Sequence, residues 1–375
     1  MVKRFTPGGL YLVVLILIVG LAGCGGRQEQ PGPVAPPAAS GQPPGNSKVI
    51  LLNGAGASFP YPIYSRWIAD YMQIDKNVKI NYQSIGSGAG IEQFSKKIID
   101  FGASDAPVSD AKTGDMAGEF LHIPTVAGPV AIIYNLPGVK EKLKFTPDIL
   151  ADIFLGQVKK WNDSRLVSLN PGVKLPDLDI AVVHRSDGSG TTYIFTDYLS
   201  AVSPAWQQQV GRGTAVSWPT GLAGKGSEGV SRQVQALPGG IGYVELSYAL
   251  LNKLAYGLVQ NSSGQFSEPS LESTLEAAAT VRVPDDLRLS IVNAPGPGAY
   301  PIAGYTYILV YKEQEDYEKG QALARFLWWA IHEGEKKAAE LAYAPLPAEI
   351  VQRVEGKLQS MTHRGQPLLG DLEKK

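Results

Sequence analysis

The chain has 375 residues, of which 44% are hydrophobic and 18% are charged. This composition is that of a globular protein, and the length is enough for two domains of ordinary size. The formal net charge of −1 excludes a general electrostatic attraction to nucleic acid, so we expect no nucleic-acid partner, and any anion site must be local.

Residues 1–23 have the pattern of a secretory signal. A basic start is followed by an apolar run over 10–21, which is too short to span a membrane comfortably. The run ends in Leu-Ala-Gly-Cys, which resembles the lipobox of bacterial lipoproteins, and Cys24 is the only cysteine in the chain. We therefore predict a signal peptide over 1–23 and a lipid on Cys24. An ordinary signal peptide and an uncleaved anchor remain the alternatives.

The segment 24–48 is predicted to be a linker on that lipid anchor. It contains six prolines among Gly, Ala, Gln and Ser. Because it has little apolar bulk to bury, we expect it to be disordered and the folded body to begin at residue 49.

Three segments of the folded body repeat one pattern, in which a short apolar strand runs into a Gly-rich turn with a serine and then into a helix. The strands are expected over 49–52, 79–85 and 180–183, and the helices over 61–71, 91–98 and 191–199. The serines of the turns are Ser58, Ser87 and Ser189, and Ser58 is placed to cap its helix. Helix N-termini carry unpaired N–H donors and about half a positive charge, so these turns favour anions.

The third turn, residues 185–191, reads Arg-Ser-Asp-Gly-Ser-Gly-Thr. Arg185 adds a planar, permanently charged fork to the N–H groups and hydroxyls of the helix start. The ligand that such a set favours is a tetrahedral anion. The alternative is an ordinary helix start in which Arg185 pairs with Asp187.

An aspartate, Asp105, follows the short strand predicted over 101–103. A carboxylate only accepts hydrogen bonds, so a fully ionised oxyanion such as sulfate would meet like charge there. Phosphate near neutral pH still carries a proton and can donate it to Asp105, which would select phosphate over sulfate. The alternative is a local turn or cap before Pro107.

The remaining elements continue an alternation of strands and helices. Further strands are expected over 131–134 and 254–259, a turn and strand over 238–244, and a strand pair or one long strand with a bend at Gly304 over 300–310. Further helices are expected over 146–155, with Thr146 as its cap, and over 246–251, 271–279 and 321–334, and residues 350–358 close the chain. This alternation predicts an α/β protein with largely parallel sheets.

The sequence lacks the motifs of several common metal, catalytic and nucleotide-binding sites. The four histidines have no metal-ligand spacing, and no G-x-S-x-G motif is present. Around Lys225 the chain lacks the first glycine and the hydroxyl residue of a phosphate loop, and residues 86–90 are only a loose match to a dinucleotide fingerprint. We therefore expect no metal, no cofactor and no catalytic activity.

With these motifs in view, the chain resembles the phosphate-binding proteins of the bacterial phosphate-specific ABC importer over nearly all of residues 49–350. The resemblance rests on GAGASFP, NYQSIGSGAG, DFGASDAP, HRSDGSGTT, PTGLAGKG, LPGGIGYVE and YAPLP. It implies a periplasmic-binding-protein fold, with two α/β domains, a hinge and a ligand cleft between them. Domain I would comprise 49–127 and 298–375, and domain II would comprise 128–297.

The resemblance also implies a set of phosphate ligands, carried over by position. They are Ser58, Phe59, Ser87, Asp105, Arg185, Ser189, Gly190 and Thr191. Asp105 would accept the phosphate proton, Arg185 would give two donors, and the others would give hydroxyl or backbone donors. The family usually has threonine where this chain has Ser58, and the hydroxyl is retained.

The function implied is that of an extracytoplasmic, lipid-anchored and monomeric receptor. It would bind inorganic phosphate and pass it to the permease and ATPase subunits of the importer, with contact to the membrane through the lipid on Cys24. The alternatives are a receptor for another oxyanion in the same fold, an extracellular phosphatase, and an adhesion or signalling protein that reuses the fold.

Overall fold

The structure is a computed structural model that describes residues 48–280 and 282–370. The predicted signal peptide, Cys24 and all of the predicted linker except Lys48 lie outside the described residues. Within the described part, none of the helices has the length and apolar character needed to cross a membrane.

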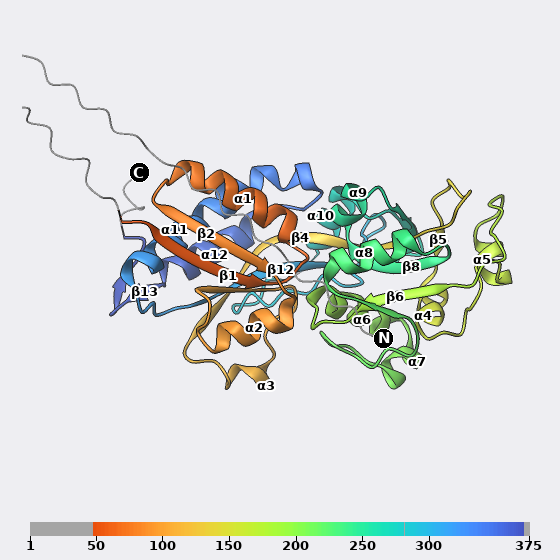
Figure 1. The fold of residues 1–375 in the computed structure, drawn as a ribbon, viewed down its shortest axis with the longest axis horizontal. Helices are drawn as coiled ribbons and strands as arrows, with labels where there is room; N and C mark the ends of the chain where they lie inside the picture. The colour runs from red at the N-terminus through yellow and green to blue at the C-terminus, as the bar shows by residue number, and fades with distance from the viewer. Residues whose placement is uncertain (1–47, 281, 371–375) are drawn as a thin grey trace, which may run out of the picture. The chain divides into compact units, whose positions relative to one another are not determined.

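A mixed sheet forms the centre of the described part (Figure 1). In spatial order its strands are β2 (Val78–Ser84), β1 (Ile50–Gly56), β3 (Phe101–Ser104), β12 (Ala303–Tyr311), β4 (Phe120–Tyr134), β8 (Gly240–Glu245), β6 (Ala181–Arg185) and β7 (Leu222–Gly224), with β9 (Ala255–Tyr256) paired to β4.

Strand β4 lies in the middle of this sheet and contributes to both of its halves. Its residues 120–129 pair with β12, whereas residues 130–134 pair with β8. We call β2, β1, β3, β12 and residues 120–129 the first half of the sheet, and β8, β6, β7, β9 and residues 130–134 the second half. In Figure 1 the orange strands of the first half lie on the left and the green strands of the second half on the right.

The prediction of largely parallel sheets is wrong for the centre of the sheet. Strand β1 is parallel to β2 and β3, and β6 is parallel to β7 and β8. However, β4 is antiparallel to both β12 and β8. The chain leaves the first half through β4 and returns to it through β12, so these two neighbours run in opposite directions. Apolar periodicity does not report strand direction.

The length of β4 also exceeds the prediction, which placed a strand over 131–134 only. Pro124, Gly128 and Pro129 interrupt the residues before it, and proline and glycine are weak strand formers. Pairing with β12 on one side keeps this segment extended in spite of them.

Helices pack against each half. With the first half lie α1 (Tyr61–Ile74), α2 (Ser87–Ser95), α11 (Tyr317–His332) and α12 (Ala348–Gln359), and with the second half lie α4 (Pro147–Phe154), α6 (Gly190–Val202), α8 (Gly226–Ala236), α9 (Leu246–Leu251) and α10 (Leu271–Ala278). Shorter elements are α3 (Asp110–Thr113), α5 (Ser164–Leu169), α7 (Pro204–Gln209), η1 (Gly334–Lys337), η2 (Ala339–Leu341), β5 (Lys144–Phe145), β10 (Leu258–Gln260), β11 (Phe266–Ser267), β13 (Thr362–His363) and β14 (Gln366–Pro367).

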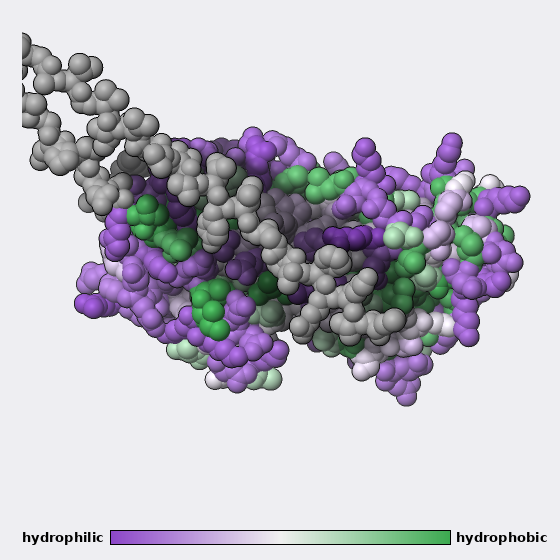
Figure 2. All heavy atoms as spheres, in the orientation of Figure 1, coloured by the Kyte–Doolittle hydropathy of each residue, from purple (hydrophilic) through white to green (hydrophobic). Residues whose placement is uncertain are grey.

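The apolar spacing that predicted α1 corresponds to its buried face. The buried residues of α1 are Ile63, Tyr64, Trp67, Ile68 and Tyr71. They join a core that extends through both sheet halves, and Figure 2 shows a mostly hydrophilic surface with separate apolar patches. Burial of these large side chains is the main term that holds α1 to the sheet.

The prediction that Ser58 caps α1 is wrong. The N-cap of α1 is Pro60 and no side chain caps the helix, because the Ser58 hydroxyl faces the second half of the sheet. Thr146 is the N-cap residue of α4, as predicted, but its buried hydroxyl makes no capping bond and has no hydrogen-bond partner in the described part.

Three further features differ from the prediction, because strand pairing and packing decide where an element begins, divides or bends. Helix α2 begins at Ser87, earlier than the predicted 91. The strand predicted over 254–259 is two short strands separated at Gly257. Strand β12 is a single strand whose irregularity lies between Thr306 and Tyr307, where its register with β4 shifts, and not at Gly304.

Candidate functional site

All eight residues of the predicted site are buried. They are Ser58, Phe59, Ser87, Asp105, Arg185, Ser189, Gly190 and Thr191. The first four belong to the first half of the sheet or to the turns that follow its strands, and the last four belong to β6 and the start of α6. The site therefore lies where the two halves meet.

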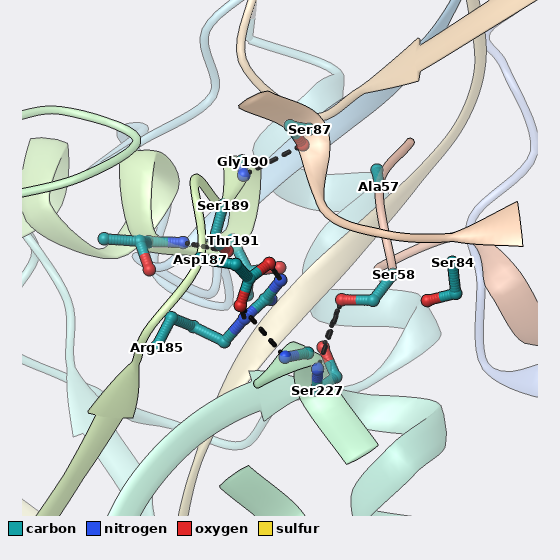
Figure 3. Close-up of polar contacts among 12 residues, drawn as sticks. Ala57, Ser58, Ser84, Ser87, Arg185, Asp187, Ser189, Gly190, Thr191 and Ser227 are labelled. Atoms are coloured by element: carbon teal, nitrogen blue, oxygen red, sulfur yellow. Dashed lines mark hydrogen bonds and ion pairs between the residues drawn. The ribbon is translucent and has the colours of Figure 1, made fainter. Parts of the chain in front are cut away.

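Two of the predicted turns are hydrogen-bonded to each other. The N–H of Gly190, in the first turn of α6, donates to the Ser87 hydroxyl oxygen at 2.9 Å, as Figure 3 shows. The N–H of Gly88 donates to the carbonyl oxygen of Gly188 at 2.9 Å. The start of α2 and the start of α6 thus face each other, and both helices direct N–H groups into the same region.

The start of α6 requires a glycine. A Cβ at Gly190 would lie 2.5 Å from the Cβ of Asp105 and 2.6 Å from its backbone nitrogen. Ser189 is the N-cap, and its hydroxyl oxygen accepts a hydrogen bond from the Thr192 N–H at 3.0 Å. The hydroxyl proton of Ser189 is thereby left free for another acceptor.

Asp105 accepts hydrogen bonds from two threonines. Its Oδ1 accepts from the Thr306 hydroxyl of β12 at 2.9 Å, and its Oδ2 lies 3.4 Å from the Thr191 hydroxyl of α6. The turn before Pro107 is closed instead by Ser104, whose hydroxyl oxygen accepts from the Ala106 N–H. The geometry therefore does not favour the alternative in which Asp105 serves that turn.

The pKa of the Asp105 carboxyl is raised to about 7 by burial, although the Thr306 hydrogen bond and the charge of Arg185 oppose the rise. An aspartate with this pKa exchanges a proton near neutral pH. It is therefore suited to share a proton with a ligand that titrates in the same range.

Arg185 is paired with Asp187, as the alternative interpretation expected. The Nε donates to Asp187 Oδ1 at 2.8 Å, and an Nη2 proton donates to Oδ2. Burial by itself lowers the pKa of Arg185, but the hydrogen bond and charge of Asp187 outweigh it, so the pKa stays above its ordinary value. The pairing uses two of the five N–H donors of the guanidinium. Pairing with Asp187 therefore orients Arg185 and leaves donors for an anion.

Ser58 is bonded to the second half of the sheet. Its hydroxyl oxygen lies 2.9 Å from the Ser227 hydroxyl and accepts from the Ser227 N–H at 3.2 Å, and Figure 3 shows the two side chains pointing toward each other. The Phe59 ring is fully buried against Tyr343. Only the backbone of Phe59 can therefore serve a ligand.

The start of α8 is the part of the site that the sequence prediction missed. The Gly226 N–H donates to Asp187 Oδ1 at 2.9 Å, and Ser227 contacts Ser58. Strand β7, a glycine-rich turn, a serine and a helix form the same pattern as the other three turns. This repeated pattern could have identified the start of α8 from the sequence, although the segment does not match a phosphate loop. Thr306, which contacts Asp105, carried no sequence signal.

In the residues that the structure describes, no group of three or more His, Cys, Asp or Glu side chains has the geometry of a metal site. The assembled site combines several neutral donors, one arginine and two carboxylates, Asp105 and Asp187, of which Asp187 pairs with the arginine. Such a set has the donors that a small oxyanion requires.

The chain is similar to known proteins over most of its length. Residues 33–333 match the family model described as a PBP superfamily domain. The chain is 46% identical over 354 residues to the phosphate-binding protein PstS of Xylella fastidiosa strain Temecula1, covering 92% of this chain and 96% of that protein. It is 38% identical over 380 residues to the phosphate-binding protein PstS of Methanocaldococcus jannaschii, covering 94% of each.

The fold is shared with solved structures. The structure of a phosphate-binding protein from Stenotrophomonas maltophilia matches with a TM-score of 0.65 at 20% identity, over 85% of this chain and 96% of that one. This likeness and the superfamily match confirm the predicted periplasmic-binding-protein fold.

Proposed function

Because the chain belongs to the PstS family of phosphate-binding proteins, we propose that it is the receptor of a phosphate importer. It binds inorganic phosphate outside the cytoplasm and delivers it to the permease and ATPase subunits of an ABC transporter. The bound ligand is a substrate for transport, and the protein itself has no catalytic activity.

The observation that carries this proposal is that residues of the two sheet halves meet: Gly190 bonds to Ser87, Thr191 and the charge of Arg185 lie near Asp105, and Ser58 bonds to Ser227. Hydroxyl and N–H donors from both halves of the sheet point to one place, together with a guanidinium. The proposed phosphate ligands are the eight residues predicted from the sequence. Their donors would surround the phosphate oxygens, and the guanidinium would balance the charge.

Asp105 accounts for the choice among oxyanions. A buried carboxylate repels sulfate, which has no proton to donate near neutral pH. Phosphate donates its remaining proton to the carboxylate and turns the repulsion into a hydrogen bond. Selection therefore rests on the proton that the ligand brings.

We propose that the two sheet halves correspond to two domains, with domain I over 49–127 and 298–375 and domain II over 128–297. The chain crosses between them in β4 and returns before β12. Ser58, Ser87 and Asp105 then lie in one domain and Arg185 in the other. Phosphate would join the two and stabilise the closed arrangement.

We also propose that the protein is held at the outer face of a membrane as a monomer by a lipid on Cys24, after removal of residues 1–23. The support is the sequence pattern Leu-Ala-Gly-Cys and the proline-rich segment that follows it. Mass spectrometry of the protein purified from membranes would test this, since the proposal requires a diacylated N-terminal cysteine.

Isothermal titration calorimetry with phosphate, arsenate and sulfate tests the proposed ligand. We expect tight binding of phosphate, weaker binding of arsenate and no measurable binding of sulfate at about pH 8.5, where the Asp105 carboxyl, with its pKa of about 7, is ionised. Tighter binding of sulfate than of phosphate would contradict the proposal. Hydrolysis of a generic phosphoester by the purified protein would instead indicate a phosphatase.

A further inference from the structure

Ser58 is held by donors from the opposite half of the sheet at both its side chain and its backbone. Ser227 places its hydroxyl 2.9 Å and its N–H 3.2 Å from the Ser58 hydroxyl oxygen. Tyr248 of α9 donates its hydroxyl to the Ser58 carbonyl oxygen at 2.7 Å. All three residues are buried.

The hydrogen-bonding positions of the Ser58 hydroxyl determine how the contact with Ser227 affects the direction of the Ser58 proton. A serine hydroxyl has one proton and two acceptor positions. The N–H and the hydroxyl of Ser227 can occupy both acceptor positions, which leaves the Ser58 proton as the one group still to be used. The Ser227 N–H is a donor in any case; with the Ser227 hydroxyl as donor of the 2.9 Å pair, the Ser58 proton points elsewhere.

Helix α8 fixes the donors of Ser227. Ser227 is the second residue of this helix, so its N–H is one of the donors without an intrahelical acceptor. The preceding N–H, from Gly226, donates to Asp187, which in turn pairs with Arg185. The same helix start therefore orients the ligands of both halves.

Tyr248 holds the backbone of Ser58. Besides its bond to the Ser58 carbonyl, its hydroxyl lies 3.0 Å from Glu228 of α8. Burial and the charge of Glu228 raise the pKa of Tyr248, so the phenol stays protonated and remains a donor. The backbone of Ser58 is thus fixed from the same direction as its side chain.

We propose that Ser227 is a positioning residue for phosphate. It occupies the acceptor positions of the Ser58 hydroxyl from the opposite half of the sheet and so directs the Ser58 proton to the bound anion. This inference rests on the proposed function, since it assigns Ser227 a role in phosphate binding by Ser58. Ser227 itself makes no contact with the phosphate.

A double-mutant cycle on the full chain tests the inference, with phosphate titrated by calorimetry. Ser227→Ala should weaken phosphate binding by about five- to tenfold, which is the effect of one lost hydrogen bond. In the Ser58→Ala background the same change should have less than about a twofold effect, because the residue that it orients is gone. Ser227→Thr keeps the hydroxyl and should restore most of the affinity.

The chain offers a matched control on the same helix. Ser231 is also a buried serine of α8, but its hydroxyl has no hydrogen-bond partner among the described residues. Ser231→Ala should bind phosphate as the wild type does. The unfolding midpoints of Ser227→Ala and Ser231→Ala without phosphate should be similar, which separates positioning from a general loss of stability.

The outcomes are distinguishable from failure of the proposed function. If the wild type binds no phosphate, the proposed function and this inference both fail. If the wild type binds phosphate and Ser227→Ala binds it equally well, only the inference fails. An equal loss in the wild-type and Ser58→Ala backgrounds would show that Ser227 acts independently of Ser58, for instance as a direct ligand, and would also overturn it.

Discussion

Thr306 donates its hydroxyl to Oδ1 of Asp105 at 2.9 Å, between two residues that are 201 positions apart in the chain. The contact exists because β12 lies antiparallel to β3, with Tyr307 opposite Ser104. Both residues are buried, and the carboxyl of Asp105 has a pKa of about 7 because of that burial. Thr306 therefore helps to decide at which pH Asp105 can accept a proton from a ligand.

Thr306→Val should make phosphate binding more sensitive to acid. The change removes a hydrogen bond that lowers the pKa of Asp105, so the pKa rises further and more of the carboxyl is protonated near neutral pH. Since a protonated Asp105 cannot accept the phosphate proton, the loss of affinity should be larger at about pH 6 than at about pH 8.5. Calorimetric titrations at both values measure it.

The control for this prediction is Thr274→Val. Thr274 is a fully buried threonine of α10 that donates to a backbone carbonyl. Its replacement should leave the pH dependence of binding unchanged. A Thr306→Val protein with the same relative loss at both pH values would show that Thr306 does not act through Asp105.

Asp105→Asn should weaken phosphate binding by about 10- to 100-fold and allow sulfate to bind. The amide can donate a hydrogen bond, so it no longer repels an anion that lacks a proton. Competition titrations with phosphate and sulfate check both effects. Asp197→Asn, at an aspartate of α6 that pairs with Arg212, is the control. Unchanged selectivity in Asp105→Asn would remove Asp105 from the site.

Arg185→Ala should reduce the binding free energy of phosphate by about 2–5 kcal/mol, because it removes a buried charge partner of the anion. Arg185→Lys keeps the charge but not the planar fork that pairs with Asp187, so it should recover only part of the loss. Calorimetry gives both values. An Arg185→Lys protein with full affinity would show that charge alone is needed there.

Glu245→Gln should change how stability depends on pH. Glu245 is fully buried at the end of β8, and burial raises its pKa from 4.5 to about 8. The folded state therefore holds a proton that the unfolded state releases, so this stabilisation is complete below pH 4.5 and is lost as the pH rises to about 8. Glutamine stays neutral at every pH, so the Glu245→Gln variant should not lose stability over this pH range.

Urea unfolding at several pH values measures this prediction. Between pH 4.5 and 8 the free energy of unfolding of the wild type should fall relative to that of Glu245→Gln, by an amount on the order of a few kcal/mol. Glu349→Gln, at an exposed side chain, is the control. Parallel pH profiles for the wild type and Glu245→Gln would contradict the prediction.

Gly90→Ala should destabilise the fold by about 1–3 kcal/mol, because a Cβ on this residue of α2 would lie 2.4 Å from the Cα of Gly56 and 2.8 Å from the carbonyl oxygen of Ala55. Gly356→Ala on α12 meets nothing within 4 Å, so it should stabilise the helix by about 0.5–1 kcal/mol. Thermal unfolding of the two variants compares them. Equal midpoints would show that α2 can move away from β1.

The candidate site was largely predictable because its residues occur in short motifs. Each of the turns with Ser58, Ser87 and Ser189 combines a strand end, glycine and a helix start, and these are local features that sequence reports well. Asp105 was recognisable as a carboxylate among anion-seeking turns. Ser227 was missed because its segment was compared with a phosphate loop and not with the other three turns.

The local sequence determined which segments form helices and strands, because apolar spacing, glycine turns and helix starts act over a few residues. The tertiary structure alone decided the antiparallel centre of the sheet, the length of β4 and the partners of the site residues. Thr306 reaches Asp105 through the pairing of β12 with β3, and Ser227 reaches Ser58 because the start of α8 lies against the turn before α1. No short-range pattern encodes such contacts, because they depend on how the whole chain buries its apolar surface.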